Sequence, residues 1–325
     1  MVVYKCAILA DPKSRVWEFA KEIYTKISAK SDQFSLNQVH INKFRDGEIK
    51  PKIEDNVRKH NCFFIHDSSK PPTEWLTELV LVNNALQGSS ANEVTNVLPY
   101  LRFARQDRKD ETRVPISARV VADMIGLYAD RVVSIDVHNP ALQGFYNIPF
   151  DNLLSFSTVI KYLRANHPDT LEDVMVMSPD AGGTERASAL SKKLGGTGDI
   201  AVGYKRRVEA GKVADLKILG DVRGKNVFVV DDIIDSGGTL VKACEALKDG
   251  GARNVYAYAT HGIFTKGTEH LTACFDKVFV SDTLIRDGSQ NGVEVIPFAP
   301  LFAEAIYRIH MGESLSQLFD GDYSL

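Results

Sequence analysis

The sequence has few cysteines and no spacing typical of a cysteine-based site. Its four cysteines, Cys6, Cys62, Cys244 and Cys274, are scattered over 325 residues. None of them has the paired spacing of a zinc or redox motif. Each lies in an apolar stretch, so we expect buried, reduced thiols in a cytosolic protein. The pattern argues against both a disulfide framework and a cysteine-ligated metal site.

The sequence also lacks a long hydrophobic run and an excess of either charge. No apolar run approaches a membrane span, and the short run Cys6–Ala10 stops at Asp11-Pro12, unlike a signal peptide. Lys and Arg number 39 against 42 Asp and Glu, a net charge of −3, so no overall field favours nucleic acid or an anionic membrane. We expect a soluble, cytoplasmic protein without nucleic-acid or membrane partners, in which local basic clusters bind any anionic substrate.

Neither a low-complexity linker nor a close internal repeat interrupts the chain. The length indicates about two domains, and the composition, 44% hydrophobic and 25% charged, is that of a globular protein. Short apolar runs alternate with amphipathic helical patterns, which predicts an α/β fold with two mainly parallel, doubly wound sheets flanked by helices. We place the boundary near Asp151–Ser155, after Pro149, giving domains at 1–152 and 153–301. A terminal helical pattern at 302–325 is expected to pack back on the first domain.

The expected elements can be located by their hydrophobic patterns. The strand candidates are Cys6–Ala10, Leu36–Ile41, Cys62–His66, Val94–Leu98, Val132–Asp136, Val174–Ser178, Ile200–Gly203, Asn226–Asp231, Val255–Thr260, Lys277–Val280 and Val293–Pro297. The helix candidates are Trp17–Ile27, Trp75–Leu86, Ser117–Tyr128, Phe156–Ala165, Glu185–Leu194, Leu240–Leu247 and Phe302–His310.

The segment 227–239 is the most informative part of the sequence. The apolar run 227–230 leads into two adjacent carboxylates, and a glycine-rich turn then opens a helical pattern. Such a turn presents backbone N–H groups and a helix N-terminus to an anion. Carboxylates beside a phosphate would repel it unless they hold sugar hydroxyls or a bridging Mg²⁺. The segment therefore predicts a sugar-phosphate site, with Asp231 and Asp232 on the ribose and Asp235, Ser236, Gly237, Gly238 and Thr239 around the phosphate. A surface turn is the alternative.

A second turn, SPDAGGTER at 178–186, repeats this logic after another apolar strand. Its four residues Asp180, Ala181, Gly182 and Gly183 form a second candidate anion cradle, which suggests two phosphate groups or two substrates. Asp180 is either a metal ligand or a helix N-cap.

Charged segments supply further candidates, each with a structural alternative. Asp136 and His138 follow a strand and could share one face, or His138 could be purely structural. The basic run 204–212 lies in a connection of about 20 residues between two strands, which is long enough to suggest a closing loop. The alternative is a charged loop that is only solvated. The run 103–113 could grip a triphosphate. In 43–48, Asp-Gly indicates a hairpin, while Phe44, Asp46 and Glu48 could bind a base.

Together these segments resemble the ribose-phosphate diphosphokinase family, the synthetases of 5-phosphoribosyl 1-diphosphate. The match is collinear over nearly the whole chain and comprises FRDGE, RFARQDRKD, VHNPALQGFYNIPFDNL, SPDAGGTER, YKRR, GDVRGKNVFVVDDIIDSGGT and EAIYRIHMGESLSQLF. The resemblance implies two type I phosphoribosyltransferase-like domains, assembled as dimers within a homohexamer.

The resemblance also implies a reaction and a role for each site residue. The anomeric hydroxyl of ribose 5-phosphate attacks the β-phosphorus of ATP, and AMP leaves. Mg²⁺ is the implied cofactor, bound by His138 and Asp180, and Lys205 and Arg207 are the catalytic pair. Asp180–Gly183 would receive the diphosphate, and Asp231 with Asp235–Thr239 would hold ribose 5-phosphate. The residues that would contact ATP are Phe44, Asp46, Gly47, Glu48, Arg105 and Gln106.

The chain departs from the family pattern at several positions. Ser236 replaces a usual threonine, and the run after Arg207 lacks the usual proline and asparagine. Asn56 and the segment 85–94 lack side chains found where many members bind phosphate as activator and ADP as inhibitor, so phosphate activation need not follow the family. Two alternatives remain: a phosphoribosyltransferase, for which the N-terminal motifs would have no purpose, and a catalytically silent regulatory subunit.

Overall fold

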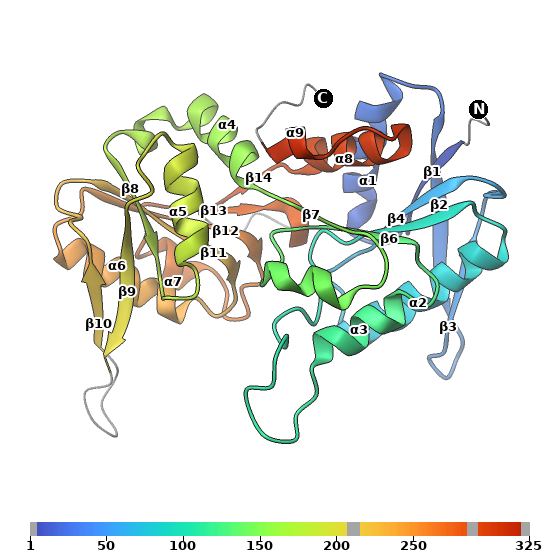
Figure 1. The fold of residues 1–325 in the computed structure, drawn as a ribbon, viewed down its shortest axis with the longest axis horizontal. Helices are drawn as coiled ribbons and strands as arrows, with labels where there is room; N and C mark the ends of the chain where they lie inside the picture. Colours follow the sequence, from blue (N-terminus) through green and yellow to red (C-terminus); the bar gives the residue numbers. More distant parts are fainter. Residues whose placement is uncertain (1–4, 207–214, 285–291, 320–325) are drawn as a thin grey trace. The chain divides into compact units, whose positions relative to one another are not determined.

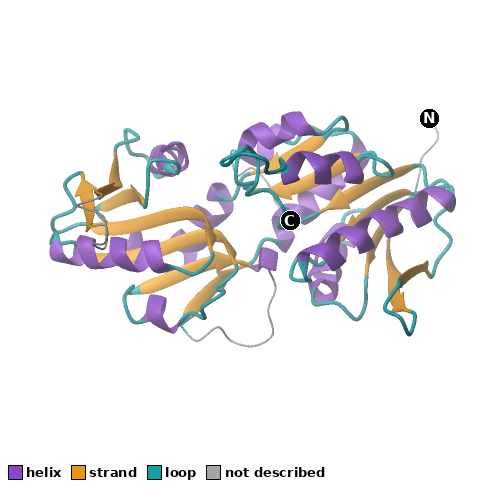
Figure 2. Cartoon of the chain, turned by 90° about the horizontal axis from the view of Figure 1, so that it is seen from below, coloured by secondary structure: helices purple, strands orange, loops and turns teal. Residues whose placement is uncertain are grey.

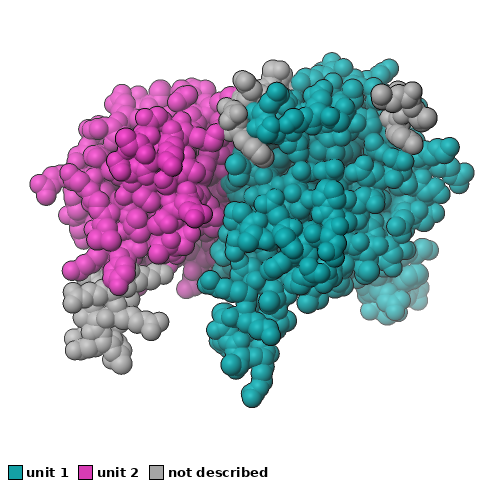
Figure 3. Space-filling model, in the orientation of Figure 1, with its two compact units in different colours: residues 1–154, 283–287, 298–325 teal, residues 155–282, 288–297 magenta. Residues whose placement is uncertain are grey.

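The computed structural model describes residues 5–206, 215–284 and 292–319. The chain divides into two compact units (Figure 3). Unit 1 comprises residues 1–154, 283–287 and 298–325, and unit 2 comprises 155–282 and 288–297. The first division lies between Leu154 and Ser155, close to the position expected from the sequence.

Unit 1 is built on one seven-stranded sheet with the order β3-β2-β1-β4-β5-β6-β7. All neighbours pair in parallel except β2 and β3, which form an antiparallel hairpin at one edge. The elements of the unit up to residue 154 are β1 (Cys6–Ala10), α1 (Val16–Ser28), β2 (Phe34–Lys43), β3 (Ile49–Ile53), β4 (Asn61–Ile65), α2 (Pro72–Gly88), β5 (Glu93–Val97), α3 (Ser117–Ile125), β6 (Arg131–Ile135), the 3-10 helix η1 (Pro140–Phe145) and β7 (Phe150–Leu153).

Unit 2 has the same architecture, with the order β10-β9-β8-β11-β12-β13-β14 and one antiparallel edge hairpin, β9–β10. Each strand number is that of its unit 1 counterpart plus seven, so two segments without a close sequence repeat adopt one topology. The elements are α4 (Phe156–Asn166), η2 (Pro168–Leu171), β8 (Val174–Ser178), α5 (Thr184–Lys193), β9 (Ile200–Arg206), β10 (Asp215–Leu219), β11 (Asn226–Ile234), α6 (Gly238–Asp249), β12 (Asn254–Gly262), α7 (Glu269–Thr272), β13 (Lys277–Ser281) and β14 (Val293–Ile296).

Each unit has its own hydrophobic core, with helices flanking the strands (Figure 2). The central strands are apolar on both faces, as expected for parallel strands covered by helices; in β1 all five residues are fully buried. The C-terminal α8 (Ala299–Met311) packs against α1 in unit 1 (Figure 1). Between these helices, Phe19 and Phe302 meet edge to face with ring centroids 5.6 Å apart. The short α9 (Ser316–Phe319) follows α8.

The sequence located the central strands and the long helices within a few residues, but it missed three strands. These are the two antiparallel edge strands, β3 and β10, and the other edge strand of unit 1, β7. Edge strands have one open side and a partly polar composition, so they lack the long apolar run used as the criterion. No helix in the described part of the chain is long and apolar enough to cross a membrane.

Candidate functional site

The acidic pair lies inside β11, where the sequence had placed it at the end of the strand. β11 continues to Ile234, and Asp231 pairs in register with Ala259 of β12. The expected boundary was wrong because the pairing with β12 persists beyond the apolar run. Asp232 is buried and Asp231 is half-buried.

Arg186 of α5 neutralises this pair, a partner that the sequence reasoning did not identify. Its Nη1 lies 3.1 Å from Asp232 Oδ1 and 3.4 Å from Asp231 Oδ1. Arg186 follows the glycines of the SPDAGGTER turn, so the start of α5 connects the two predicted loops. Burial, followed by the neighbouring Asp232 carboxyl, raises the pKa of Asp231 to about 8, while Arg186 opposes the shift. Burial and the second carboxyl therefore favour the protonated form of Asp231.

Replacement of Asp231 by asparagine is expected to remove a pH dependence of stability. A carboxyl with a raised folded-state pKa stabilises the fold while it is protonated. For Asp231 this contribution declines from its ordinary pKa of 3.8 and is lost above about 8, at no more than about 1.4 kcal/mol per pH unit. Urea unfolding of both proteins from pH 5 to 9 should show wild type losing stability relative to Asp231→Asn up to about pH 8. The exposed control Asp249→Asn should run parallel to wild type, and parallel Asp231→Asn curves would contradict the shift.

The turn Asp235–Thr239 leads directly into α6, as predicted. Gly237 adopts a left-handed conformation with φ of +72°, and α6 has no side-chain cap. Among the described residues, no hydrogen bond uses the backbone N–H of Gly237, Gly238 or Thr239. The helix therefore begins with unpaired donors and the positive end of its dipole, which suits a phosphate.

The second turn is held closed by its own aspartate. Asp180 Oδ1 accepts hydrogen bonds from the N–H groups of Gly182 (2.9 Å) and Gly183 (3.3 Å) within the turn. The N-cap of α5 is Gly183, without a side-chain cap, so Asp180 is not the helix N-cap. An ideal Cβ on Gly183 would lie 2.7 Å from Ser178 Oγ, so only glycine fits. The Asp180 carboxylate therefore uses two backbone N–H groups of the turn that was predicted to bind an anion.

The basic segment starts in a strand, contrary to the prediction of one long loop. Lys205 belongs to β9 and pairs with Leu216 of β10. The error arose because Asp215–Leu219 has alternating rather than continuous apolar residues, so the returning strand was overlooked. Arg207 and Lys212 lie outside the described residues, and the structure describes only the backbone of Lys205.

In unit 1, the FRDGE segment forms the tip of the equivalent edge hairpin, β2–β3. Phe44 N–H donates to Glu48 O at 2.8 Å, and Gly47 has φ of +95°. This is the hairpin that Asp-Gly predicted. Phe44 is 53% exposed, with Lys50 Nζ 5.6 Å from its ring centroid.

A shallow groove of about 510 Å³ lies beside this hairpin. It is lined by Lys43, Gly47, Glu48, Ile49, Thr73, Glu74, Thr77 and Leu81. Lys43 Nζ and Glu74 Oε1 form an ion pair at 2.8 Å, joining the hairpin to α2. The groove brings together two of the predicted ATP residues, Gly47 and Glu48; Arg105 and Gln106 do not line it.

The other predicted ATP residues lie in the loop between β5 and α3. Arg105 is exposed, and Gln106 donates through Nε2 to Asp110 Oδ1 at 2.9 Å within the same loop. This loop is tied to the VHNP segment, since Asn139 Nδ2 donates to Asp107 Oδ2 at 2.7 Å.

His138 is exposed just beyond β6. The expectation that Asp136 and His138 alternate along one strand was wrong. β6 ends at Ile135, and Asp136 has φ of +41°, which breaks the extended geometry that alternation requires.

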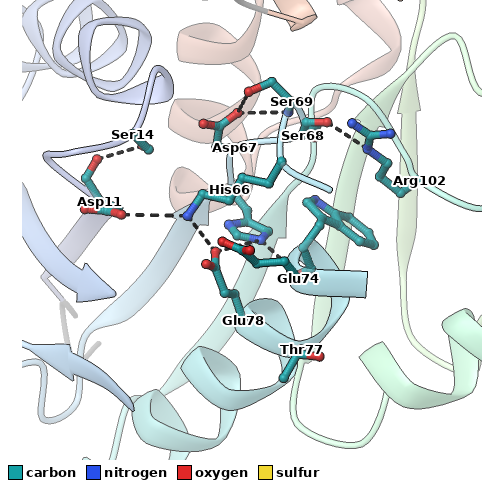
Figure 4. A network of polar contacts seen from close by, with 12 residues as sticks. Asp11, Ser14, His66, Asp67, Ser68, Ser69, Glu74, Thr77, Glu78 and Arg102 are labelled. Atoms are coloured by element: carbon teal, nitrogen blue, oxygen red, sulfur yellow. Dashed lines mark hydrogen bonds and ion pairs between the residues drawn. The ribbon is translucent and has the colours of Figure 1, made fainter. Parts of the chain in front are cut away.

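Beyond β1 and β4, unit 1 contains a buried polar network that the sequence reasoning missed (Figure 4). Glu78 of α2 is fully buried, and its Oε2 lies 2.7 Å from Lys70 Nζ. His66 Nε2 donates to Trp75 O at 3.0 Å, and burial lowers the pKa of His66 to about 3, so it is neutral. The sequence pattern that could have indicated this network is a row of polar residues directly after an apolar strand. The same pattern identified Asp231.

The described residues offer no ready-made cage for a metal ion. No group of three or more His, Cys, Asp or Glu side chains among them is arranged to hold one. His138 belongs to unit 1 and Asp180 to unit 2. Asp180 is exposed and its Oδ1 makes only neutral hydrogen bonds. Such a donor fits Mg²⁺, which commonly takes one or two carboxylates and completes its shell with water and substrate phosphates.

Known proteins resemble the chain over both units. Residues 13–127 match the family described as the N-terminal domain of ribose phosphate pyrophosphokinase, and residues 204–320 match the phosphoribosyl synthetase-associated domain. The ribose-phosphate pyrophosphokinase of Campylobacter jejuni is 39% identical over 305 residues, covering 93% of this chain and 96% of that protein. That of Aquifex aeolicus is 43% identical over 288 residues, covering 87% and 91%.

A solved structure has the same fold. The crystal structure of phosphoribosylpyrophosphate synthetase from Mycobacterium smegmatis superposes with a TM-score of 0.84 at 31% identity, covering 95% of this chain and all of that chain. With both units matched in sequence and in fold, the chain belongs to the ribose-phosphate pyrophosphokinase family.

Proposed function

We propose that the chain is a ribose-phosphate diphosphokinase. It transfers the β,γ-diphosphoryl group of ATP to the C1 hydroxyl of ribose 5-phosphate and releases 5-phosphoribosyl 1-diphosphate and AMP. The observation that carries the proposal is the site in unit 2, where a buried acidic pair on β11 is followed by a glycine turn with unpaired N–H groups. Relatives named for this activity match nearly the whole chain.

The sugar phosphate is assigned to unit 2. The 5-phosphate accepts hydrogen bonds from the backbone of Asp235–Thr239 at the start of α6. The ribose hydroxyls donate to Asp231 and Asp232, whose mutual repulsion Arg186 reduces. This division explains why carboxylates and an anion-binding turn are adjacent in one sequence.

ATP is assigned to the hairpin and loop of unit 1. The exposed ring of Phe44 offers an aromatic surface for adenine, and Asp46, Gly47 and Glu48 supply polar contacts. Arg105 and Gln106 grip the triphosphate. Lys205 and Arg207 neutralise the charge that develops as the diphosphoryl group moves.

The reaction breaks one bond and forms one. The C1 hydroxyl oxygen bonds to the β-phosphorus, and the bond from that phosphorus to the oxygen bridging it to the α-phosphate breaks. AMP departs with that oxygen, and the hydroxyl proton passes to water. Little covalent chemistry is required of the protein, so positioning and charge stabilisation dominate. The Asp180–Gly183 turn receives the diphosphate in place of the Asp180 carboxylate.

Mg²⁺ is the proposed cofactor, held by His138 and Asp180 together with substrate phosphates. When bound, it neutralises phosphate charge. For assembly we propose a homohexamer built from dimers; sedimentation of a stable monomer in the analytical ultracentrifuge would contradict this.

The function is tested by quantifying AMP after mixing the protein with Mg²⁺, ATP and ribose 5-phosphate, with and without inorganic phosphate. We expect AMP only when the sugar phosphate is present. Turnover in the phosphate-free arm would show that phosphate is not a required activator. No AMP in either arm, from protein that binds ATP, would favour a silent regulatory subunit instead.

A further inference from the structure

A histidine outside the predicted site holds the turn that is assigned to the 5-phosphate. His270 lies in the short helix α7, which packs against α6 (Figure 1). Its Nε2 lies 2.9 Å from the carbonyl oxygen of Ser236. A carbonyl oxygen can only accept a hydrogen bond, so Nε2 carries the proton and donates.

This hydrogen bond fixes the orientation of the Ser236–Gly237 peptide. The described chain contains no cis peptide bond, and in a planar trans peptide the N–H points opposite to the C=O. Because His270 draws the Ser236 carbonyl toward α7, the Gly237 N–H is directed away from α7. That N–H has no hydrogen-bond partner among the described residues, so it remains available to an anion.

Packing and a second anchor support the same arrangement. A Cβ on Gly237 would lie 2.8 Å from His270 Nε2 and 2.9 Å from Leu271 Cδ2, so α7 packs directly against the glycine. Asp235, the residue before Ser236, is held from the same side. Thr265 Oγ1 donates to Asp235 Oδ1 at 2.7 Å, and Thr265 N–H donates to Asp235 O at 3.1 Å. The segment after β12 therefore braces the start of the turn from one side.

We propose that His270 is a positioning residue for the phosphate turn, which keeps the Gly237 N–H directed at the 5-phosphate of ribose 5-phosphate. The inference rests on the proposed function and extends it to a residue that does not touch the substrate. Without the imidazole donor, the Ser236–Gly237 peptide is free to rotate. A rotated peptide presents a carbonyl oxygen to the phosphate, which repels it.

The test compares His270→Leu, which removes the donor, with His270→Gln, whose amide nitrogen can replace Nε2. We expect His270→Leu to raise the KM for ribose 5-phosphate about 10-fold, as for the loss of one hydrogen bond to a charged group. The KM for ATP should stay unchanged, and His270→Gln should restore most of the lost affinity. Thr272→Val, which removes an unrelated hydroxyl bond in α7, should behave as wild type.

A binding measurement separates this inference from the proposed activity. Ribose 5-phosphate is titrated by calorimetry into the full chain with Mg²⁺ and an ATP analogue that carries a methylene group between the α and β phosphates. Weaker binding by His270→Leu supports the inference even if wild type releases no AMP. An active wild type with an equal KM for ribose 5-phosphate in His270→Leu overturns the inference alone.

Two further outcomes would overturn the inference, and a second variant is available if the first does not fold. A wild-type chain that binds no ribose 5-phosphate overturns both the inference and the proposed function. If His270→Leu does not fold, His270→Met replaces it, because a flexible thioether fills the same space without a donor. Equal rises in KM for both substrates would indicate general damage and overturn the positioning role.

Discussion

Replacement of Lys205 by alanine is expected to lower the turnover number at least ~100-fold while ATP and ribose 5-phosphate still bind. This is the scale of losing one transition-state donor. Lys205 is the sixth residue of β9, a strand that pairs with β10 at the edge of the sheet. Its proposed partner is the charge that grows on the diphosphoryl group, so the loss should fall on kcat rather than on KM. Steady-state kinetics with varied ATP and ribose 5-phosphate measure the two separately.

A lysine on the partner strand of the same hairpin provides the control. Lys217 of β10 is exposed and pairs in register with Tyr204. Lys217→Ala removes the same charge and the same side-chain length from the hairpin, and turnover should stay within about 2-fold of wild type. Equal losses in the two variants would show that the hairpin needs its overall charge or strand structure. Unchanged turnover in Lys205→Ala would refute its catalytic assignment.

The turns that we propose to bind anions could be predicted from the sequence because their chemistry is local. An apolar run followed by Asp-Ser-Gly-Gly-Thr predicted a strand, a glycine turn and a helix start, and the structure has all three, with Gly237 in a left-handed conformation. Likewise Asp-Gly predicted the hairpin at 44–48, because glycine readily adopts the positive φ that such a turn requires, as Gly47 does. The two-unit α/β fold followed from alternating patterns for the same reason.

The supporting contacts could not be read in this way because they join residues distant in sequence. Arg186 lies in α5 and contacts the carboxylates of Asp231 and Asp232 in β11. His270 lies in the four-residue helix α7 and hydrogen-bonds to the carbonyl oxygen of Ser236. Neither residue belongs to a sequence motif from which its hydrogen-bond partner could be predicted. The sequence also did not show that β11 extends past the acidic pair, because that extension depends on the pairing with β12.

Replacement of Lys70 by methionine is expected to destabilise unit 1 by about 3–5 kcal/mol. This range is typical when one partner of a buried ion pair is removed and the other is left uncompensated. Glu78 has no exposed surface, its Oε1 has no hydrogen-bond partner in the described structure, and Lys70 is the cation that contacts its Oε2 (Figure 4). His66 lies 3.8 Å from the same oxygen but is neutral, so it cannot replace the lysine.

The pH dependence of this loss distinguishes a buried charge from simple loss of packing. Burial already raises the pKa of Glu78 above its ordinary 4.5, and removing Lys70 raises it further. A carboxyl with a raised folded-state pKa stabilises the fold when protonated, so the deficit of Lys70→Met should be smallest at acid pH and grow as pH rises. Urea unfolding from pH 5 to 8 measures this. The double variant Lys70→Met/Glu78→Leu removes both charges and should recover most of the stability at every pH. A loss of stability that does not change with pH, or one below about 1 kcal/mol, would contradict a buried charge. It would mean that the side chains of Lys70 and Glu78 stabilise unit 1 only by filling space.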